Sequence, residues 1–272
     1  MPSIAVDNNG YIHIAFIKSE GNTLRVMYAD NTNGVFTVKQ VDVTGYVNTA
    51  FPSIAVDSNG NSHIVFYGQD DEGDYYILYC NYTSTGLSHP IKLNSTLRTP
   101  VEAPIPIPSV TVDENNTVHI VFTAADLEHY TDGQPNANYT AVYYLNITEG
   151  KISQPEKVSG KVEEASHPTI AIRNKVIYIV FSGRNNTWTA WDYDVYYADN
   201  STGTWNTQRI IDDEHSDLYP DIAVDNYGYI HILFYQTLSD FSAAKIWYVT
   251  NSPNPPHPIV RQVNLWLWVG IG

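Results

Sequence analysis

The sequence predicts an all-β fold, a five-bladed β-propeller of four-stranded antiparallel blades, and internal repetition is the main reason. The segment Pro-Ser-Ile-Ala-Val-Asp at residues 2–7 recurs unchanged from Pro52. Looser copies start at Pro108, Pro168 and Pro220. Each copy is followed by a strand of alternating polarity and then by an aromatic-rich strand. Repeats of four short strands and about 50 residues are typical of propeller blades.

The expected strands follow in the same order in every repeat. The first is the Pro-Ser-Ile-Ala-Val segment itself. Period-2 alternation and β-branched residues predict the second strands at 11–16, 62–66, 118–122, 177–181 and 230–234. The third strands are expected at 26–29, 75–79, 142–144, 195–198 and 246–249, and the fourth at 36–43, 91–93, 152–158, 205–211 and 259–263. No window shows a 3.6-residue period, so no α-helix is expected.

These repeats predict one domain over residues 1–264, with blades at about 2–51, 52–107, 108–167, 168–219 and 220–264. The apolar extension 265–272 has no counterpart in the other copies. Its alternating pattern suits an added strand, which predicts self-assembly into a surface array or filament by pairing with an exposed blade edge. The alternative is the start of a truncated membrane anchor.

The turn between the first and second strands has a clear mechanism. Asp7, Asp57 and Asp225 stand where a side chain can cap the turn, and Gly10, Gly60 and Gly228 stand where φ must be positive. Asn116 replaces the glycine in the third copy, and asparagine is the next residue to tolerate that backbone conformation.

The segment Asp199-Asn-Ser-Thr-Gly-Thr-Trp205 resembles a degenerate Asp-box, the hairpin motif of BNR-repeat (sialidase-like) propellers. The resemblance implies a propeller and carries no activity, because the catalytic motifs of that family are not matched. Sialidases hold the substrate carboxylate with three arginines, whereas only Arg98 and Arg184 of this chain are expected on the variable loops.

The predicted strand order places the loops between second and third strands and the loops between blades on one face. These loops differ in every copy, and binding residues usually lie on such loops. Flat aromatic rings beside carboxylates and amides suit sugar recognition, so we expect a glycan-binding site there. The candidate ligand-binding residues are Tyr46, Phe51, His129, His167, Arg184, Trp188, Trp191, His215 and Tyr219.

A glycoside hydrolase or polysaccharide lyase is the enzymatic alternative, since two carboxylates about 5–10 Å apart over a pocket would suffice. No nucleophile elbow, phosphate loop or His-Glu-x-x-His motif is present, and no catalytic residue is assigned. A third alternative is a structural subunit of a surface array.

Two clusters suggest metal. Asp70, Asp71, Glu72 and Asp74 surround one glycine and form a candidate calcium site, with a solvated acidic loop as the alternative. His13, His63, His119 and His231 occupy one position in four repeats. Because this position is set by the repeat, we expect each histidine to bond within its own blade.

Composition limits the partners and the compartment. The formal net charge is −15, which excludes nucleic acid as a partner, and a single cysteine excludes a disulfide framework. Sequons for N-glycosylation occur at Asn81, Asn94, Asn115, Asn138, Asn146, Asn185 and Asn200. Together these features predict an extracellular or cell-surface glycoprotein that binds a glycan or another surface component.

Overall fold

The structure is a computed structural model that describes residues 2–93, 107–129, 139–185, 193–212, 215–237 and 244–253. Within these ranges the secondary structure is β-strand apart from one 3₁₀ turn, Leu127–His129. The all-β prediction is therefore confirmed. In the described part of the chain, no helix has the length and apolar character needed to cross a membrane.

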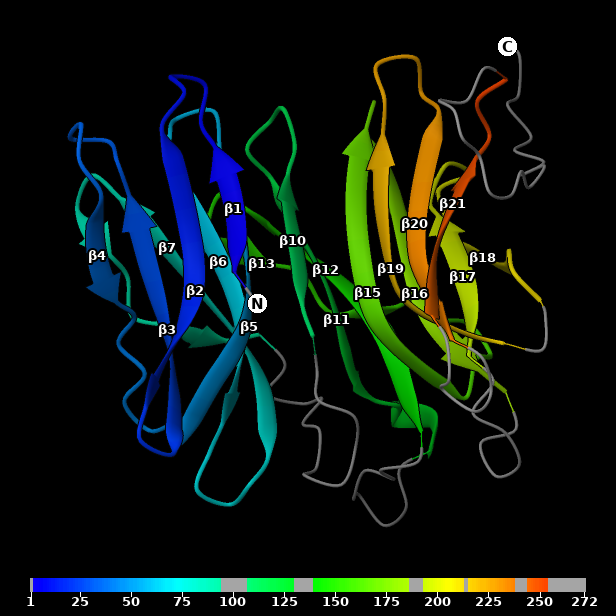
Figure 1. The fold of residues 1–272 in the computed structure, drawn as a ribbon, viewed down its shortest axis with the longest axis horizontal. Helices are drawn as coiled ribbons and strands as arrows, with labels where there is room; N and C mark the ends of the chain where they lie inside the picture. Colours follow the sequence, from blue (N-terminus) through cyan, green and yellow to red (C-terminus); the bar gives the residue numbers. More distant parts are fainter. Residues whose placement is uncertain are drawn as a thin grey trace.

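The described strands follow one another in five groups, one for each sequence repeat, which we call units, and pair into four sheets (Figure 1). The first unit contains β1 (Ser3–Val6), β2 (Ile12–Glu20), β3 (Thr23–Asp30) and β4 (Thr37–Gln40). The second contains β5 (Asn48–Val56), β6 (Ser62–Gln69), β7 (Tyr75–Thr83), β8 (Gly86–Leu87) and β9 (Ile91–Lys92). The third contains β10 (Ser109–Val112), β11 (Val118–Ala125), β12 (Thr140–Thr148), β13 (Lys151–Ile152) and β14 (Glu156–Lys157). The fourth contains β15 (Glu164–Arg173), β16 (Val176–Arg184), β17 (Asp194–Asp199) and β18 (Asn206–Arg209), and the fifth contains β19 (Ser216–Val224), β20 (Ile230–Thr237) and β21 (Ala244–Thr250).

Neighbouring strands within a unit pair in antiparallel order, as the alternating pattern predicts. The third and fourth units join into one sheet through a single parallel pair between Thr140 of β12 and Glu164 of β15. In the second unit the predicted fourth strand at 91–93 corresponds to β9, and the short β8 also pairs with β7. In the third unit the strand predicted at 152–158 is split into β13 and β14. In the fifth unit it was predicted at 259–263, outside the described residues.

Apolar side chains on facing sheets form the core. Four buried clusters fill the spaces between consecutive units, the largest of them between the second and third. Each central strand alternates its side chains between two such clusters. In β11, Ile120 packs toward the second unit and Val121 toward the fourth. The described sheets therefore stack on one another, and those of the second, third and fourth units are buried on both faces.

The described sheets do not close into a ring. Among the described strands, those of the first unit pair with none of those of the fifth. Figure 1 shows β1–β4 and β20–β21 on opposite sides of β10. The predicted closure of the ring is therefore not seen among the described strands.

The turns between first and second strands confirm the predicted chemistry. Oδ1 of Asp7 accepts hydrogen bonds from the backbone N–H groups of Asn9 (2.9 Å) and Tyr11 (2.8 Å), and Gly10 has φ +82°. Asn116 takes the same role as that glycine, with φ +62°.

Each repeated histidine bonds within its own unit, as expected, and His13 also bonds to the Ser62 hydroxyl of the second unit at 2.9 Å. Nδ1 of His63 shares a 2.7 Å hydrogen bond with the Tyr79 hydroxyl, and Nε2 lies 3.6 Å from Asp57. His13, His119 and His231 make the equivalent contacts to a tyrosine and to a turn aspartate. Each Asp-His-Tyr chain ties a turn to the third strand.

Candidate functional site

Three bulky residues adopt left-handed backbone conformations at one shared position of the first strands. Phe51, His167 and Tyr219 have φ values of 49°, 54° and 53°, and each directly precedes a proline. The strand register shifts at each of these places, which marks a β-bulge. Such a conformation costs about 1–3 kcal/mol in a residue with a side chain, and strain of this kind clusters at functional sites.

All three bulge residues lie toward the end of the sheets that carries the connections between units, which we call the loop end. It is the lower end in Figure 1, opposite the tight turns. The rings of His167 and Tyr219, from the fourth and fifth units, meet edge to face with centroids 4.4 Å apart. Phe51 packs against Tyr67 at 5.7 Å. Tyr219 is 56% exposed, so its ring is available to a ligand.

Burial sets the protonation of His167. Desolvation lowers the pKa of its imidazole to about 4. Nδ1 shares a 2.9 Å hydrogen bond with the hydroxyl of Ser166. The bulge therefore presents a neutral imidazole beside the exposed tyrosine at neutral pH.

A buried charged cluster supports the same end of the fourth unit. Glu164 is 6% exposed, and its Oε2 accepts hydrogen bonds from Nε (2.9 Å) and Nη2 (2.7 Å) of Arg184. The hydroxyl of Tyr193 donates to Oε1 of the same carboxylate, and the guanidinium lies 4.8 Å from the Tyr193 ring centroid. Burial raises the pKa of Tyr193, so this hydroxyl stays protonated and serves as a donor.

Asp217 of the fifth unit contacts the same cluster through its backbone and carries a second buried carboxylate. Its backbone N–H donates to the carbonyl oxygen of Tyr193 at 2.6 Å, and its Oδ1 accepts from Nε2 of Gln236 at 2.9 Å. The Asp217 side chain is fully buried. Tyr193 therefore contacts both acidic residues, one through its hydroxyl and one through its backbone.

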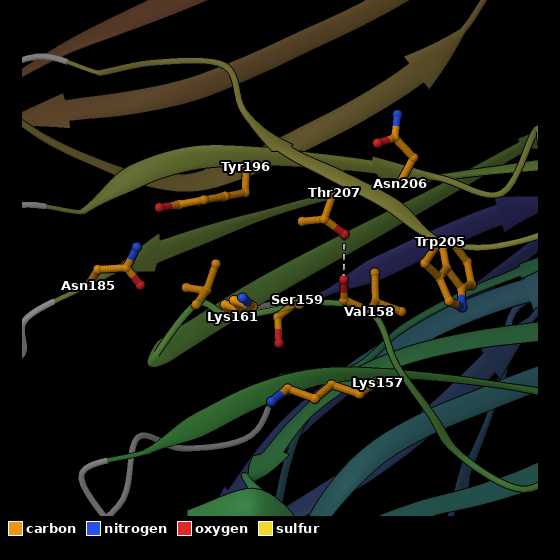
Figure 2. Close-up of a pocket in the computed structure, with 11 residues that line it drawn as sticks. Lys157, Val158, Ser159, Lys161, Asn185, Tyr196, Trp205, Asn206 and Thr207 are labelled. Carbon is orange, nitrogen blue, oxygen red and sulfur yellow. Dashed lines mark hydrogen bonds between the residues drawn. The ribbon is translucent and has the colours of Figure 1, made fainter.

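A groove of about 560 Å³ runs between the outer strands of the third and fourth units (Figure 2). It begins at Asn185 and Lys161 and extends past Tyr196 to Trp205. The hydroxyl of Thr207 crosses its floor and donates to the carbonyl oxygen of Val158 at 2.6 Å. The lining thus combines aromatic rings, amides and an exposed ammonium group.

The acidic residues of the third unit are paired among themselves. Asp126, which is 1% exposed, accepts from Nζ of Lys157 at 3.0 Å and bonds to Nδ1 of His129 at 2.9 Å. The ring of His129 stacks on Tyr139 at 3.9 Å. Glu128 accepts a second bond from Lys157 at 2.7 Å. Hydrogen bonds from Lys157 and His129 hold the pKa of Asp126 below its ordinary value despite burial.

The structure brings together some of the residues singled out in the sequence. Phe51, His167 and Tyr219 share the bulge position, and Arg184 lies in the neighbouring cluster. Tyr46 lies in the connection between the first and second units, beside Gly68, where burial raises its pKa to about 12, and Lys92 lies over its ring at 5.7 Å. His129 belongs to the third unit, and His215 directly precedes β19. Trp188 and Trp191 lie outside the described residues.

The candidate calcium residues form a hairpin turn. Oδ1 of Asp70 accepts from the backbone N–H of Asp74 at 3.0 Å, and the two backbones also bond to each other. Among the described residues, which include Asp71 and Glu72, no group of three or more acidic, histidine or cysteine side chains is arranged to hold a metal ion.

The described sequons differ in accessibility. Asn115 is exposed in a turn, whereas Asn81 and Asn146 lie within strands. The side-chain oxygens of Asn185 and Asn200 accept backbone hydrogen bonds. Asn94 and Asn138 lie outside the described residues.

The sequence analysis did not predict that Glu164, Asp217 and Tyr193 lie close together. The signal that could have linked two of them is the aromatic-proline pair. Alignment on His167-Pro168 and Tyr219-Pro220 places Glu164 and Asp217 at the start of the same strand in neighbouring units.

The chain matches no family model and no curated protein by sequence. Its fold is similar to that of a thermostable family-43 glycoside hydrolase, at 13% identity over 96% of this chain and 95% of the other, with a TM-score of 0.53. A Hadza microbial sialidase is similar at 11% identity over 86% of this chain, with a TM-score of 0.51, and this chain spans 52% of its length. A protein of unknown function from Dyadobacter fermentans gives a TM-score of 0.60 at 12% identity, over 90% of this chain and 81% of the other.

These likenesses define the class of fold. The chain is an all-β protein whose structural neighbours are β-propellers, among them glycoside hydrolases. The predicted relation to sialidase-like propellers is therefore supported at the level of the fold.

Proposed function

We propose that this protein binds a carbohydrate at its loop end, where Tyr219 and His167 meet beside the cluster formed by Glu164, Arg184 and Tyr193. The observation that carries the proposal is the exposed Tyr219 ring on a strained backbone. A rigid aromatic face packs against the C–H groups of a sugar ring. The two neighbours named for acting on glycosides favour the same class of ligand.

The groove of Figure 2 extends this proposed site outward. Asn185 links the two parts, because its Oδ1 accepts a 3.2 Å hydrogen bond from the backbone N–H of Glu163, the residue that precedes Glu164. Amide and hydroxyl groups at Asn185, Asn206 and Tyr196 match the hydroxyls of an extended glycan.

The test is binding to a panel of soluble polysaccharides, measured by affinity electrophoresis and then by calorimetry. Tyr219→Ala should weaken binding of the best polysaccharide at least about tenfold. Tyr227→Ala is the matched control, because Tyr227 belongs to the same unit, is 86% exposed and lies in the turn at the opposite end. Equal affinities of the two variants would contradict the proposed site, and so would an absence of binding across the panel.

Glycoside hydrolysis is the second candidate, and the two buried carboxylates around Tyr193 favour it. Glycosidases of most families use a pair of carboxylic side chains. Glu164 and Asp217 are that pair, and Arg184 positions Glu164. Release of reducing ends from the bound polysaccharide would distinguish hydrolysis from binding alone. Glu164→Gln and Asp217→Asn should abolish this release, whereas Asp221→Asn, an exposed position of the same strand β19, should not.

The remaining sequence-based expectations belong to the same proposal. They are the division into five four-stranded blades, a location outside the cell, attachment of glycans at sequons and assembly through residues 265–272. Intact mass of the natively produced protein tests the glycans. We expect Asn115 to be occupied first, because it is exposed, whereas the side chain of Asn185, also exposed, accepts a backbone hydrogen bond.

A further inference from the structure

The groove between the third and fourth units has an equivalent place between the first and second units, where a tyrosine side chain stands. Val162 and Tyr46 hold the same position in these two connections, since the backbone N–H of each donates to the carbonyl oxygen three residues earlier, at 3.2 Å and 3.0 Å. Each side chain also lies against a glycine in the second strand of the following unit. A Cβ at Gly183 would be 2.7 Å from Cγ1 of Val162, and a Cβ at Gly68 would be equally close to Cδ1 of the tyrosine. Val162 therefore leaves open a space that a phenol ring occupies in the other connection.

A cation covers the tyrosine in the one place and is held by carboxylates in the other. Lys92 of the second unit and Arg209 of the fourth stand at equivalent positions, each paired with the same residue of its third strand. Nζ of Lys92 lies 5.7 Å from the centroid of the Tyr46 ring. Arg209 instead donates to Asp194 at 3.0 Å and to Asp212 at 2.6 Å, and it is not among the described residues that line the groove. A short side chain and a cation engaged elsewhere thus keep this groove open.

A fixed aromatic ring forms one end of the groove. Nε1 of Trp205 donates to Oε2 of Glu156 at 3.0 Å, and the indole meets the Tyr144 ring edge to face with centroids 5.2 Å apart. Both contacts are with the third unit, so they fix the ring across the boundary between the two units. Trp205 is half-buried, which leaves part of the indole exposed. A rigid and partly exposed ring of this kind packs against the C–H face of a sugar residue.

The polar side chains along the groove keep hydrogen-bonding capacity beyond their internal bonds. The Ser159 hydroxyl accepts from a backbone N–H at 3.2 Å, and its own proton has no acceptor among the described residues. The Thr207 hydroxyl donates to a backbone carbonyl oxygen at 2.6 Å, so its oxygen can still accept. The Asn185 side-chain oxygen accepts a backbone N–H at 3.2 Å, and its NH₂ group can still donate. Donors and acceptors in one groove suit sugar hydroxyls, because each hydroxyl both donates and accepts.

We propose that the groove binds a linear, neutral polysaccharide along its chain, with Trp205 as the stacking platform and Val162 as the residue that determines whether the chain can enter. This inference rests on the proposed binding of carbohydrate at the loop end and names the class of ligand for that site. Uncharged hydroxyl and amide groups supply the polar contacts in the groove. The formal net charge of −15 disfavours a polyanionic chain.

The shape of the groove favours an unbranched chain. Its lining extends from Asn185 to Trp205, which directly precedes β18, so the groove follows the outer strands (Figure 2). The hydrogen bond from Thr207 to Val158 joins the two units across the floor. A side branch on the face of the chain that lies on this floor would collide with these strands, whereas an unbranched chain would not.

The experiment is calorimetry with oligosaccharides of increasing length, prepared from the unbranched polysaccharide of the panel that binds best. Wild-type affinity should rise with length. Val162→Tyr fills the groove with the side chain found in the other connection and should weaken binding of the long oligosaccharides at least about tenfold, while the shortest that bind are unaffected. Val38→Tyr is the matched control, because Val38 is 57% exposed and holds on β4 the position that Thr207 holds on β18. Trp205→Ala empties the groove instead of filling it and should cause the same loss.

The outcomes separate this inference from the proposed function. Circular dichroism checks that each variant is folded, and Trp205→Ala decides the matter if Val162→Tyr is not. Wild-type affinities for all lengths in a folded groove variant would overturn the inference, while a loss of binding in Tyr219→Ala would leave the loop-end site standing. Equal affinity for a branched polysaccharide with the same backbone would overturn the assignment to linear chains. An absence of binding at every length in wild type would contradict the proposed function itself, and this inference with it.

Discussion

Acid should destabilise this protein before its carboxylates titrate, and His167 should account for a large share of the effect. Burial lowers the pKa of His167 to about 4, against about 6.5 for an unfolded histidine. The unfolded chain therefore binds the proton more tightly than the folded chain. The stability that the neutral imidazole contributes is complete above pH 6.5 and is lost as the pH falls toward 4. The pKa in the folded chain is about 2.5 below that in the unfolded chain, which corresponds to about 3 kcal/mol of unfolding free energy.

The assay is urea denaturation at several pH values between 7.5 and 4, for wild type and for His167→Phe. Phenylalanine is a suitable replacement because Phe51 occupies the equivalent bulge position of the second unit with nearly the same φ. Burial also lowers the pKa values of His63 and His119, so wild type should lose stability through all three residues in this window. The variant should lose about 3 kcal/mol less than wild type. Parallel curves for the two proteins would refute the reasoning.

Three further substitutions test interactions that hold the sheets together. Arg184→Ala leaves the buried Glu164 carboxylate without its cation and should lower the unfolding free energy by about 3–5 kcal/mol, with partial recovery in the double variant that adds Glu164→Gln. Gly183→Ala places a Cβ 2.7 Å from Cγ1 of Val162 beside the groove and should cost about 1–3 kcal/mol, measured by urea denaturation. Tyr79→Phe removes the hydroxyl bonded to His63 and should cost about 1–2 kcal/mol, whereas Tyr227→Phe at an exposed turn should leave the melting temperature unchanged.

Local chemistry explains why the sequence predicts the strands and turns so well. The alternation of polar and apolar residues along a strand depends only on neighbouring residues, and so does a turn with Asp at its first position and Gly three residues later. The observed turn at Asp7 has the predicted side-chain hydrogen bonds. The bulges were missed for a different reason. An aromatic residue before proline is expected to be extended, yet Phe51, His167 and Tyr219 have positive φ because the surrounding sheet imposes it.

Closure and the charged cluster depend on distant contacts. Whether five units complete a ring depends on the angle that each packed cluster sets between two sheets, and no repeat pattern records that angle. Glu164 and Arg184 come from two strands of the fourth unit, Tyr193 directly precedes a third, and Asp217 comes from the next unit. The sequence predicted the aromatic residues at the loop end, but their acidic neighbours became meaningful only once these strands were paired.

The acidic composition has a different role from the one the sequence suggested. The loop-end carboxylates of Asp126, Glu164 and Asp217 are nearly or fully buried, and the first two are paired with lysine or arginine. A carboxylate held this way is already hydrogen-bonded within the protein and adds little to the binding of a ligand hydroxyl. Recognition at this end therefore falls to the exposed Tyr219 ring and to the uncharged groups of the groove. On this argument, neutral glycans should bind more tightly than polyanionic ones, because the negative charge that remains exposed on the molecule repels the latter.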